Sequence, residues 1–151
     1  MKRLERLARK ALLRILKPFL TARPVEFDAA DLKSVLVVKQ HNELGDMLLS
    51  SPVFRAVKSH GARLSVVAGP VNLPAVIANP FIDRIFLFDS RAFLKMPWKF
   101  FGFIRKLRRE RFDAAAVPST VSFSLTSALI ASMSGARVRV GTNGGRFGFY
   151  G

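Results

Sequence analysis

The chain has 151 residues and half of them are hydrophobic, so it can build one core of ordinary size and is not a disordered tail. Its 25 Lys and Arg residues exceed its 10 Asp and Glu residues and give a formal net charge of +15, which indicates a phosphate-bearing partner. The absence of cysteine excludes disulfides, thiolate catalysis, iron–sulfur clusters and the usual structural zinc sites. Because the two histidines are far apart in the sequence, no metal site is expected.

Residues 1–24 predict a basic amphipathic helix, with eight Lys or Arg residues against one Glu. Its apolar residues follow the i, i+3, i+4 spacing of one helical face: Leu4, Leu7, Ala8, Ala11, Leu12, Ile15, Leu16 and Phe19. The cations expected to contact phosphate or membrane are Arg6, Arg9, Lys10, Arg14 and Lys17. We favour an anionic membrane surface as the partner of this helix. Docking on the protein's own body and a nucleic-acid arm are the alternatives.

The same segment does not have the pattern of a signal peptide. Arg14, Lys17 and Pro18 interrupt the apolar run, and no small-residue cleavage site follows. No window of the sequence reaches the 18 or more uncharged apolar residues typical of a membrane span. We therefore expect a cytoplasmic protein that rests on a membrane surface.

After a linker at residues 25–32, residues 33–151 predict a domain in which strands and helices alternate. We expect strands at Ser34–Lys39, Arg63–Ala68, Arg84–Phe88, Ala114–Val117 and Arg137–Val140, and helices at Met47–Ser59, Leu73–Ala78, Pro97–Arg111 and Phe123–Ser132. Strands that are apolar on both faces suit a sheet covered by helices on both sides. The predicted fold class is therefore α/β, a Rossmann-like, doubly wound and mostly parallel sheet.

In such sheets the ligand site lies beyond the carboxyl ends of the strands, so the loop after the first strand is the first candidate. It runs from Gln40 to Asp46 and matches neither a Walker loop nor the three-glycine dinucleotide turn. Gly45 allows an unusual backbone angle or the close approach of a ligand. Asp46 is either the N-cap of the following helix or a carboxylate that takes a proton from a substrate.

Four motifs in order resemble those of glycosyltransferase family 9, the heptosyltransferase family of lipopolysaccharide core assembly. The first is the stretch from Val35 to Pro52, centred on Leu44-Gly45-Asp46 and followed by Phe54-Arg55-Ala56. The others are Ala78-Asn79-Pro80-Phe81-Ile82-Asp83, then Leu107-Arg108-Arg109-Glu110-Arg111-Phe112-Asp113, then Ser134-Gly135-Ala136-Arg137 with Val140-Gly141. The resemblance covers about residues 33–142.

The resemblance implies the N-terminal, acceptor-binding half of a GT-B enzyme, whose other half holds a nucleotide-sugar such as ADP-heptose. It assigns Asp46 as the general base for an acceptor sugar hydroxyl, in an inverting transfer without metal or cofactor. His41 and Asn42 would neighbour the acceptor, and Gly45 would let it approach the loop. Because the sequence stops at Gly151, before a donor domain, we expect the chain alone to bind but not to turn over.

A second basic segment, Lys95 to Arg111, mixes Trp, Phe and Leu with seven Lys or Arg residues. We predict a crossover helix, and we expect Arg105, Arg108 and Arg109 to contact phosphate or a bilayer interface. Stacking on nucleic-acid bases is the alternative use of the same pattern. The turn at residues 143–146 has the composition to hold a phosphate through its backbone amides, with Arg146 as a candidate acceptor-binding residue, and a plain flexible loop is the alternative.

Together these patterns predict transfer of heptose or a related sugar to a lipopolysaccharide core or similar lipid-linked acceptor, at the cytoplasmic face of the inner membrane. The expected partners are that acceptor, the anionic membrane and, through the absent domain, the nucleotide-sugar. Nucleic acid is the less favoured partner. The alternative function is a non-enzymatic basic α/β module that binds anionic lipid or nucleic acid.

Overall fold

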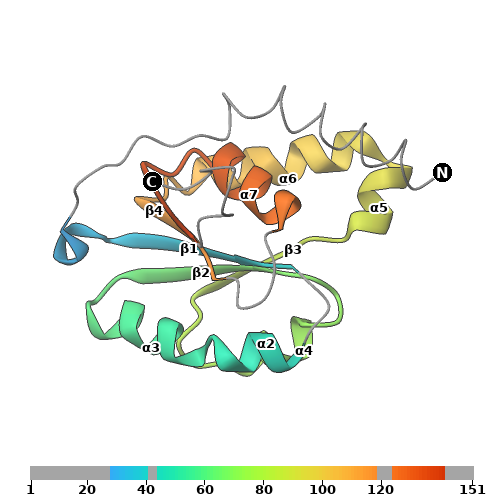
Figure 1. The fold of residues 1–151 in the computed structure, drawn as a ribbon. Helices are drawn as coiled ribbons and strands as arrows, with labels where there is room; N and C mark the ends of the chain where they lie inside the picture. The colour runs from blue at the N-terminus through green and yellow to red at the C-terminus, as the bar shows by residue number, and fades with distance from the viewer. Residues whose placement is uncertain (1–27, 41–43, 119–123, 142–151) are drawn as a thin grey trace, which may run out of the picture.

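Five parallel strands form one sheet in the order β3-β2-β1-β4-β5 in the computed structural model (Figure 1). The structure describes residues 28–40, 44–118 and 124–141. The elements are η1 Ala29–Asp31, β1 Ser34–Lys39, α2 Leu44–Leu49, α3 Ser51–Ser59, β2 Arg63–Ala68, α4 Leu73–Ile77, β3 Arg84–Leu87, α5 Ser90–Lys95, α6 Pro97–Arg109, β4 Ala114–Val117, α7 Leu125–Met133 and β5 Val138–Gly141. The doubly wound α/β fold predicted from the sequence is confirmed. The basic helix expected over residues 1–24 lies outside the described residues.

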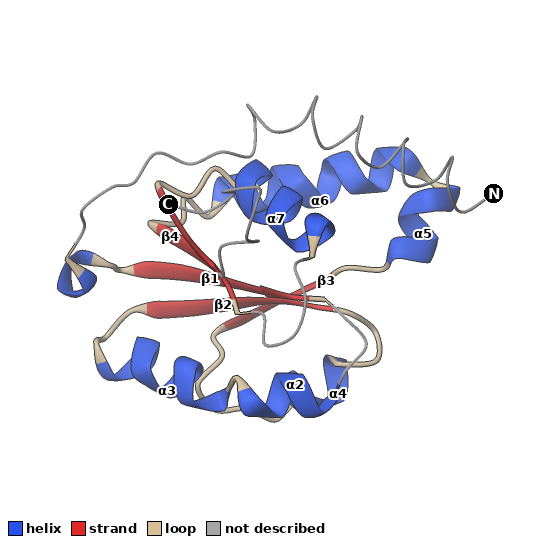
Figure 2. Ribbon diagram, in the orientation of Figure 1, coloured by secondary structure: helices blue, strands red, loops and turns tan. Residues whose placement is uncertain are grey.

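Helices cover both faces of the sheet (Figure 2). Along β1 the side chains alternate, so Val35 and Val37 pack with α2, α3 and α4, whereas Leu36 and Val38 pack with α6 and α7. Every residue of β1 is buried, as expected for a central strand covered on both sides. The apolar core therefore forms two layers, one on each side of the same strand.

Aspartates from two of the sequence motifs accept hydrogen bonds at the amino ends of β1 and β2. The Asp113 carboxylate accepts hydrogen bonds from the backbone N–H groups of Lys33 and Ser34, each at 3.0 Å, where β1 begins. The Asp83 carboxylate accepts the N–H of Leu64 at 2.7 Å in β2 and forms an ion pair with Lys58 at 2.9 Å. These motif residues therefore have a structural role at the edge opposite the carboxyl ends of the strands.

Glu110, which follows α6, forms ion pairs at the same edge of the sheet. Its carboxylate pairs with Arg84 at the start of β3 and lies 3.6 Å from the Arg63 guanidinium at the start of β2. Phe112, two residues later, is fully buried in the core beside Phe86, with ring centroids 6.3 Å apart. The motif that runs from Leu107 to Asp113 thus joins a helix end to three strand starts.

The helix expected over Met47–Ser59 is wrong as a single helix. It is divided into α2 and α3, and Ser50 lies between them. Pro52 explains the division, because proline has no N–H to donate and its ring clashes with the carbonyl of residue 48 in a continuous helix. The first helix also begins at Leu44, three residues earlier than expected.

A short helix between β3 and α6, α5, was not predicted from the sequence. The Asp89 side chain caps it by accepting the N–H groups of Arg91 at 3.0 Å and Ala92 at 3.2 Å. Met96 then leaves the helical conformation before Pro97, and α6 begins at that proline. An Asp followed seven residues later by a Met-Pro pair was the available signal for a separate helix.

Candidate functional site

The sheet has a topological switch point between β1 and β4, which are neighbours in the sheet but lead to opposite faces. After β1 the chain turns to α2 on one face, and after β4 it turns to α7 on the other (Figure 1). In open α/β sheets the two diverging loops leave a crevice at the carboxyl ends of the strands, where ligands bind. The topology therefore places the candidate site at the exits of β1 and β4.

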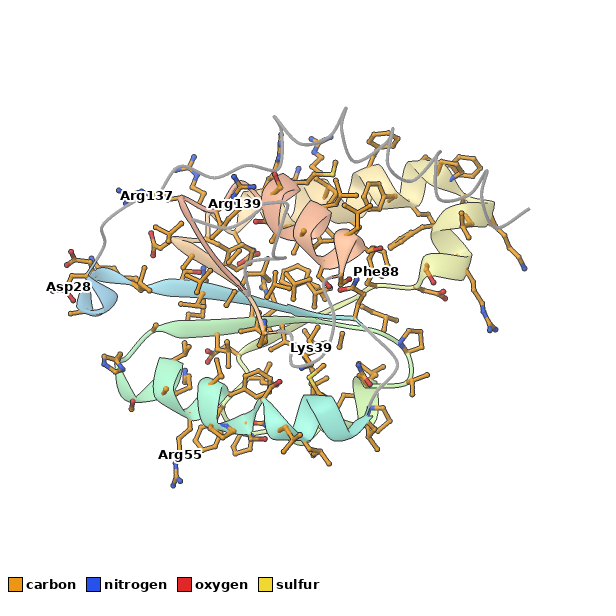
Figure 3. The ribbon with its side chains drawn as sticks, viewed as in Figure 1. Asp28, Lys39, Arg55, Phe88, Arg137 and Arg139 are labelled. Atoms are coloured by element: carbon orange, nitrogen blue, oxygen red, sulfur yellow. The ribbon has the colours of Figure 1, made fainter. Side chains whose placement is uncertain are left out.

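Polar side chains from β1, the loop after β1 and the start of α7 are buried together at this switch point. Lys39, the last residue of β1, donates from Nζ to the carbonyl oxygen of Pro118, 3.2 Å away, and so connects the exits of both strands. The Ser127 hydroxyl donates to Gln40 Oε1 at 2.9 Å, and Ser124 caps α7 by accepting the Ser127 N–H at 3.2 Å. Figure 3 shows Lys39 in the interior between the two helical layers.

The N-cap residue of α4, which follows the end of β2, also belongs to this network. Asn72 is fully buried and donates from Nδ2 to the carbonyl oxygen of Lys39 at 3.3 Å. The Gln40 Nε2 group is buried and has no hydrogen-bond partner among the described residues. A buried amide donor without a partner is costly, so a group at the crevice that accepts this hydrogen bond would be stabilised there.

The sequence analysis did not identify this network. Lys39 and Gln40 are a polar pair at the end of an apolar strand, and that change in polarity was the local signal. Their partners Ser127 and Pro118 lie about 80 residues further on, and only the topology brings them together.

The predicted catalytic motif enters α2 directly after this loop. Asp46 is the third residue of α2, so its backbone lies within the first turn and not at an N-cap, and the capping interpretation is wrong. The structure describes the backbone of Asp46 but not its side chain. Its role as general base stays a prediction.

Gly45 has helical backbone within α2, so the unusual backbone angle that a glycine permits is not used at this position. Among the described residues the glycines with positive φ are Gly61 and Gly135. A Cβ built on Gly45 would meet no atom within 4 Å, so the space beside this residue is open. Close approach of an acceptor to Gly45 stays a prediction.

The other predicted acceptor-binding residues, His41, Asn42 and Arg146, lie outside the described residues, as do Arg6, Arg9, Lys10, Arg14 and Lys17. Arg105, Arg108 and Arg109 are described and lie exposed on α6, away from the switch point. Arg108 also fastens α6 to α7, because its Nε donates to the carbonyl oxygen of Met133 at 2.9 Å.

No three His, Cys, Asp or Glu side chains within residues 28–40, 44–118 and 124–141 are grouped so that they could hold a metal ion. No helix in that part of the chain is long and apolar enough to cross a membrane.

The fold and its switch point define a Rossmann-like α/β domain of the kind found in GT-B glycosyltransferases. Two solved structures share it: the ADP-heptose lipopolysaccharide heptosyltransferase II of E. coli, with a TM-score of 0.60 and 24% identity, and a glycosyltransferase family 9 protein from Veillonella parvula, with a TM-score of 0.61 and 16% identity. Each comparison covers 78% of this chain and 33% of the other.

In sequence, the chain is 27% identical over 105 residues to the putative lipopolysaccharide heptosyltransferase 4 of Escherichia coli K12. That match covers 70% of this chain and 28% of the relative, so the chain spans less than a third of the length of that protein. No protein-family model matches the chain. These comparisons confirm the resemblance to glycosyltransferase family 9 that was inferred from the four motifs, over the part of the chain that they cover.

Proposed function

We propose that this chain is the acceptor-binding part of an inverting glycosyltransferase of lipopolysaccharide assembly. In this proposal the enzyme transfers heptose or a related sugar from a nucleotide-sugar to a lipid-linked core acceptor at the cytoplasmic face of the inner membrane. The observation that carries the proposal is the position of the Leu44-Gly45-Asp46 motif, which enters α2 directly after β1 at the switch point of the sheet.

The proposed reaction is a single displacement. The acceptor hydroxyl oxygen forms a bond to the anomeric carbon of the donor, and the bond from that carbon to the diphosphate oxygen breaks with its electron pair. Asp46 takes the hydroxyl proton. Because a carboxylate is a far weaker base than an alkoxide, the proton moves late, when the attacking oxygen has become acidic in the transition state.

The buried network at the switch point would support this chemistry by holding the loop. Lys39 connects the exits of β1 and β4 through Pro118, and Ser127 connects α7 to Gln40. These contacts fix the exit of β1, where the loop begins, and a loop anchored there can position an acceptor hydroxyl near Asp46 at lower entropic cost.

The substitution Asp46→Asn tests the role of this residue in a transferase-active form of the protein. We expect loss of sugar transfer with near-normal binding of the lipid-linked acceptor, because Asn has the shape of Asp but does not accept the proton. Transfer at the wild-type rate by Asp46→Asn would remove Asp46 from the mechanism. Loss of acceptor binding in parallel with transfer would instead assign Asp46 to binding.

The coding DNA beyond Gly151 tests the proposal for the protein as a whole. An in-frame continuation of roughly another domain's length, with a second series of strands and helices, would support an acceptor half joined to a donor half. A stop codon directly after Gly151 would contradict an acceptor half and a donor half in one polypeptide, and it would leave a membrane- or glycan-binding chain or a partner for a separate donor domain.

The net charge of +15 favours a second candidate, a non-enzymatic module that binds anionic polymers or lipid. A nucleic-acid module would bind random duplex DNA with an affinity that falls steeply as salt is raised. A domain for a glycolipid acceptor would instead discriminate between sugar headgroups of equal charge.

A further inference from the structure

The outer surface of α5 and α6 exposes three large apolar side chains. Leu94 is 84% exposed, and Trp98 and Phe101 are each 67% exposed. We call these residues, with the cations of both helices, the aromatic-basic surface. Single exposed apolar residues are normal, but neighbouring ones on one helical hairpin mark an interaction site.

A packed layer of aromatic rings supports this surface from below. Phe93 of α5 contacts Phe88 and Phe100, with ring centroids 5.1 and 5.8 Å apart, and Phe88 is buried against Phe103 at 5.7 Å. A shallow apolar groove of about 500 Å³ opens between the two helices, lined mainly by Phe88, Phe93, Leu94, Pro97, Phe100 and Phe101. The exposed side chains therefore project from a rigid base.

The charge of this segment has one sign. Residues 90–109 contain seven Lys or Arg residues and no Asp or Glu: Arg91, Lys95, Lys99, Arg105, Lys106, Arg108 and Arg109. The α6 residues Phe103, Ile104 and Leu107 are buried, whereas Trp98, Phe101 and Arg105 share the opposite, exposed side at i, i+3, i+7 spacing. Apolar residues with surrounding cations complement the acyl boundary and the phosphates of an anionic bilayer.

We infer that the aromatic-basic surface docks the protein on an anionic lipid bilayer, with Leu94, Trp98 and Phe101 entering the headgroup region. An acyl boundary accepts all three side chains, whereas nucleic-acid bases would stack on aromatic rings and leave Leu94 and the apolar groove without a partner.

The position of this surface fits the delivery of a lipid-linked acceptor, a point that rests on the proposed function. The Phe88 N–H donates to the carbonyl of Ala68 at 2.9 Å, where β2 ends, so α5 begins at the carboxyl edge of the sheet. The crevice at the exits of β1 and β4 opens at the same edge. A bilayer at the aromatic-basic surface would thus hold glycolipid headgroups on the side where the crevice lies.

Trp98 is the single tryptophan of the chain, so its fluorescence reports on this surface alone. The test mixes the full 151-residue chain with vesicles of phosphatidylcholine, with or without phosphatidylglycerol, and with lipids brominated in the acyl chain. We expect a blue shift and bromolipid quenching with the anionic vesicles at low salt, and a much smaller response with pure phosphatidylcholine. Sedimentation of the chain with anionic vesicles without any change in Trp98 emission would overturn the inference, since another segment would then carry the contact.

Two double variants keep the tryptophan and separate the surface from general binding. Leu94→Ser with Phe101→Ser should reduce bromolipid quenching by at least tenfold at equal lipid, because two of the three apolar side chains that enter the headgroup region are lost. The control, Leu49→Ser with Ile77→Ser, changes side chains that are 72% and 65% exposed on the opposite helical layer, and it should quench like the wild type. Equal quenching by both variants would contradict the inference, and far-UV circular dichroism checks that each is folded.

The charge contribution is tested in the same assay. Each cation removed by Arg105→Gln or Arg109→Gln should weaken partitioning about fivefold at low ionic strength, and this difference should shrink as salt is added. A Trp98 response that appears with duplex DNA, or with rising protein concentration, and not with anionic vesicles would show a nucleic-acid or self-association surface and would overturn the inference. This assay does not depend on sugar transfer. If the aromatic-basic surface does not bind the vesicles, the proposed glycosyltransferase function is not contradicted.

Discussion

The hydroxyl of Ser127 donates a hydrogen bond to Oε1 of Gln40, 2.9 Å away, although 87 residues separate the two in the chain. Both residues are buried. The contact joins the start of α7 to the exit of β1, and so it crosses the point at which the chain leaves the sheet toward opposite faces. Together with the Lys39 hydrogen bond to Pro118, the contact therefore holds the candidate crevice.

Removing that hydroxyl should destabilise the fold. Ser127→Ala leaves the buried Gln40 oxygen without its donor, and we expect a loss of about 1–3 kcal/mol in the free energy of unfolding. Urea denaturation followed by circular dichroism measures the change. Thr126→Ala is the matched control because Thr126 is the exposed neighbour in α7, and it should change stability by less than about 0.5 kcal/mol. Equal losses in both variants would show that the hydrogen bond contributes nothing.

The fold could be predicted from the sequence largely because the strands are short apolar runs. Val35 to Val38 and Leu64 to Ala68 are buried on both faces, as is typical of a parallel sheet that helices cover on both sides. The site was less predictable because its contacts are not local. The Lys39–Pro118 and Gln40–Ser127 pairs depend on β1 and β4 being neighbours, a fact that no local spacing contains.

The aspartates of the sequence motifs show a second reason why the site was less predictable than the fold. Asp83 and Asp113 resemble family signatures in the sequence, where structural and catalytic carboxylates look the same. In the structure both accept backbone N–H groups at strand starts, far from the carboxyl ends where ligands bind. Their place at the amino ends of the strands distinguishes these aspartates from Asp46, which lies in α2 beyond the carboxyl end of β1.

Two glycines should respond to alanine in opposite directions. Gly102 lies within α6 with open space where a Cβ would go, so Gly102→Ala should raise the free energy of unfolding by about 0.5–1 kcal/mol. Gly135 follows α7 with a φ of +79°, and Gly135→Ala should cost about 1 kcal/mol or more because alanine is strained there. Parallel thermal and urea denaturation compares the two. Shifts of the same sign would refute the assignment of their backbone roles.

Arg111 adopts a φ of +50° after the end of α6, a conformation that glycine takes without strain. Arg111→Gly should therefore stabilise the protein by roughly 1 kcal/mol, because glycine removes the strain and the Arg111 side chain that is lost is exposed. Arg111→Ala removes the same charge but keeps the strain, so it is the control and should not stabilise the fold. A gain in both variants would assign the effect to charge repulsion in the basic segment.

The Asp83–Lys58 pair predicts a pH-dependent part of the stability. Partial desolvation raises the pKa of the Asp83 carboxyl. Three interactions that lower the pKa outweigh this effect: the hydrogen bond from the Leu64 N–H, the hydrogen bond and charge of Lys58, and the charge of Arg63. The net pKa is therefore lowered. A carboxyl whose pKa is lower in the folded state stabilises the fold above its unfolded pKa of about 4 and loses that contribution as the pH falls through the folded value. Because both side chains are about one-third exposed, solvent screening limits the contribution to less than about 1 kcal/mol.

The variant Asp83→Asn tests this sign. Asn can still accept the Leu64 N–H but has no charge to pair with Lys58, so at pH 5–7 the variant should be less stable than the wild type by a constant amount of less than about 1 kcal/mol. Below about pH 4 the difference should shrink, because the wild-type carboxyl then takes up its proton. Urea denaturation at a series of pH values measures the difference, with Asp31→Asn in the exposed η1 turn as the control. No difference at pH 5–7 would show that Asp83 stabilises β2 through its hydrogen bond alone, which Asn keeps. A difference that stays constant down to pH 2 would show that the charge of the carboxylate is not its source.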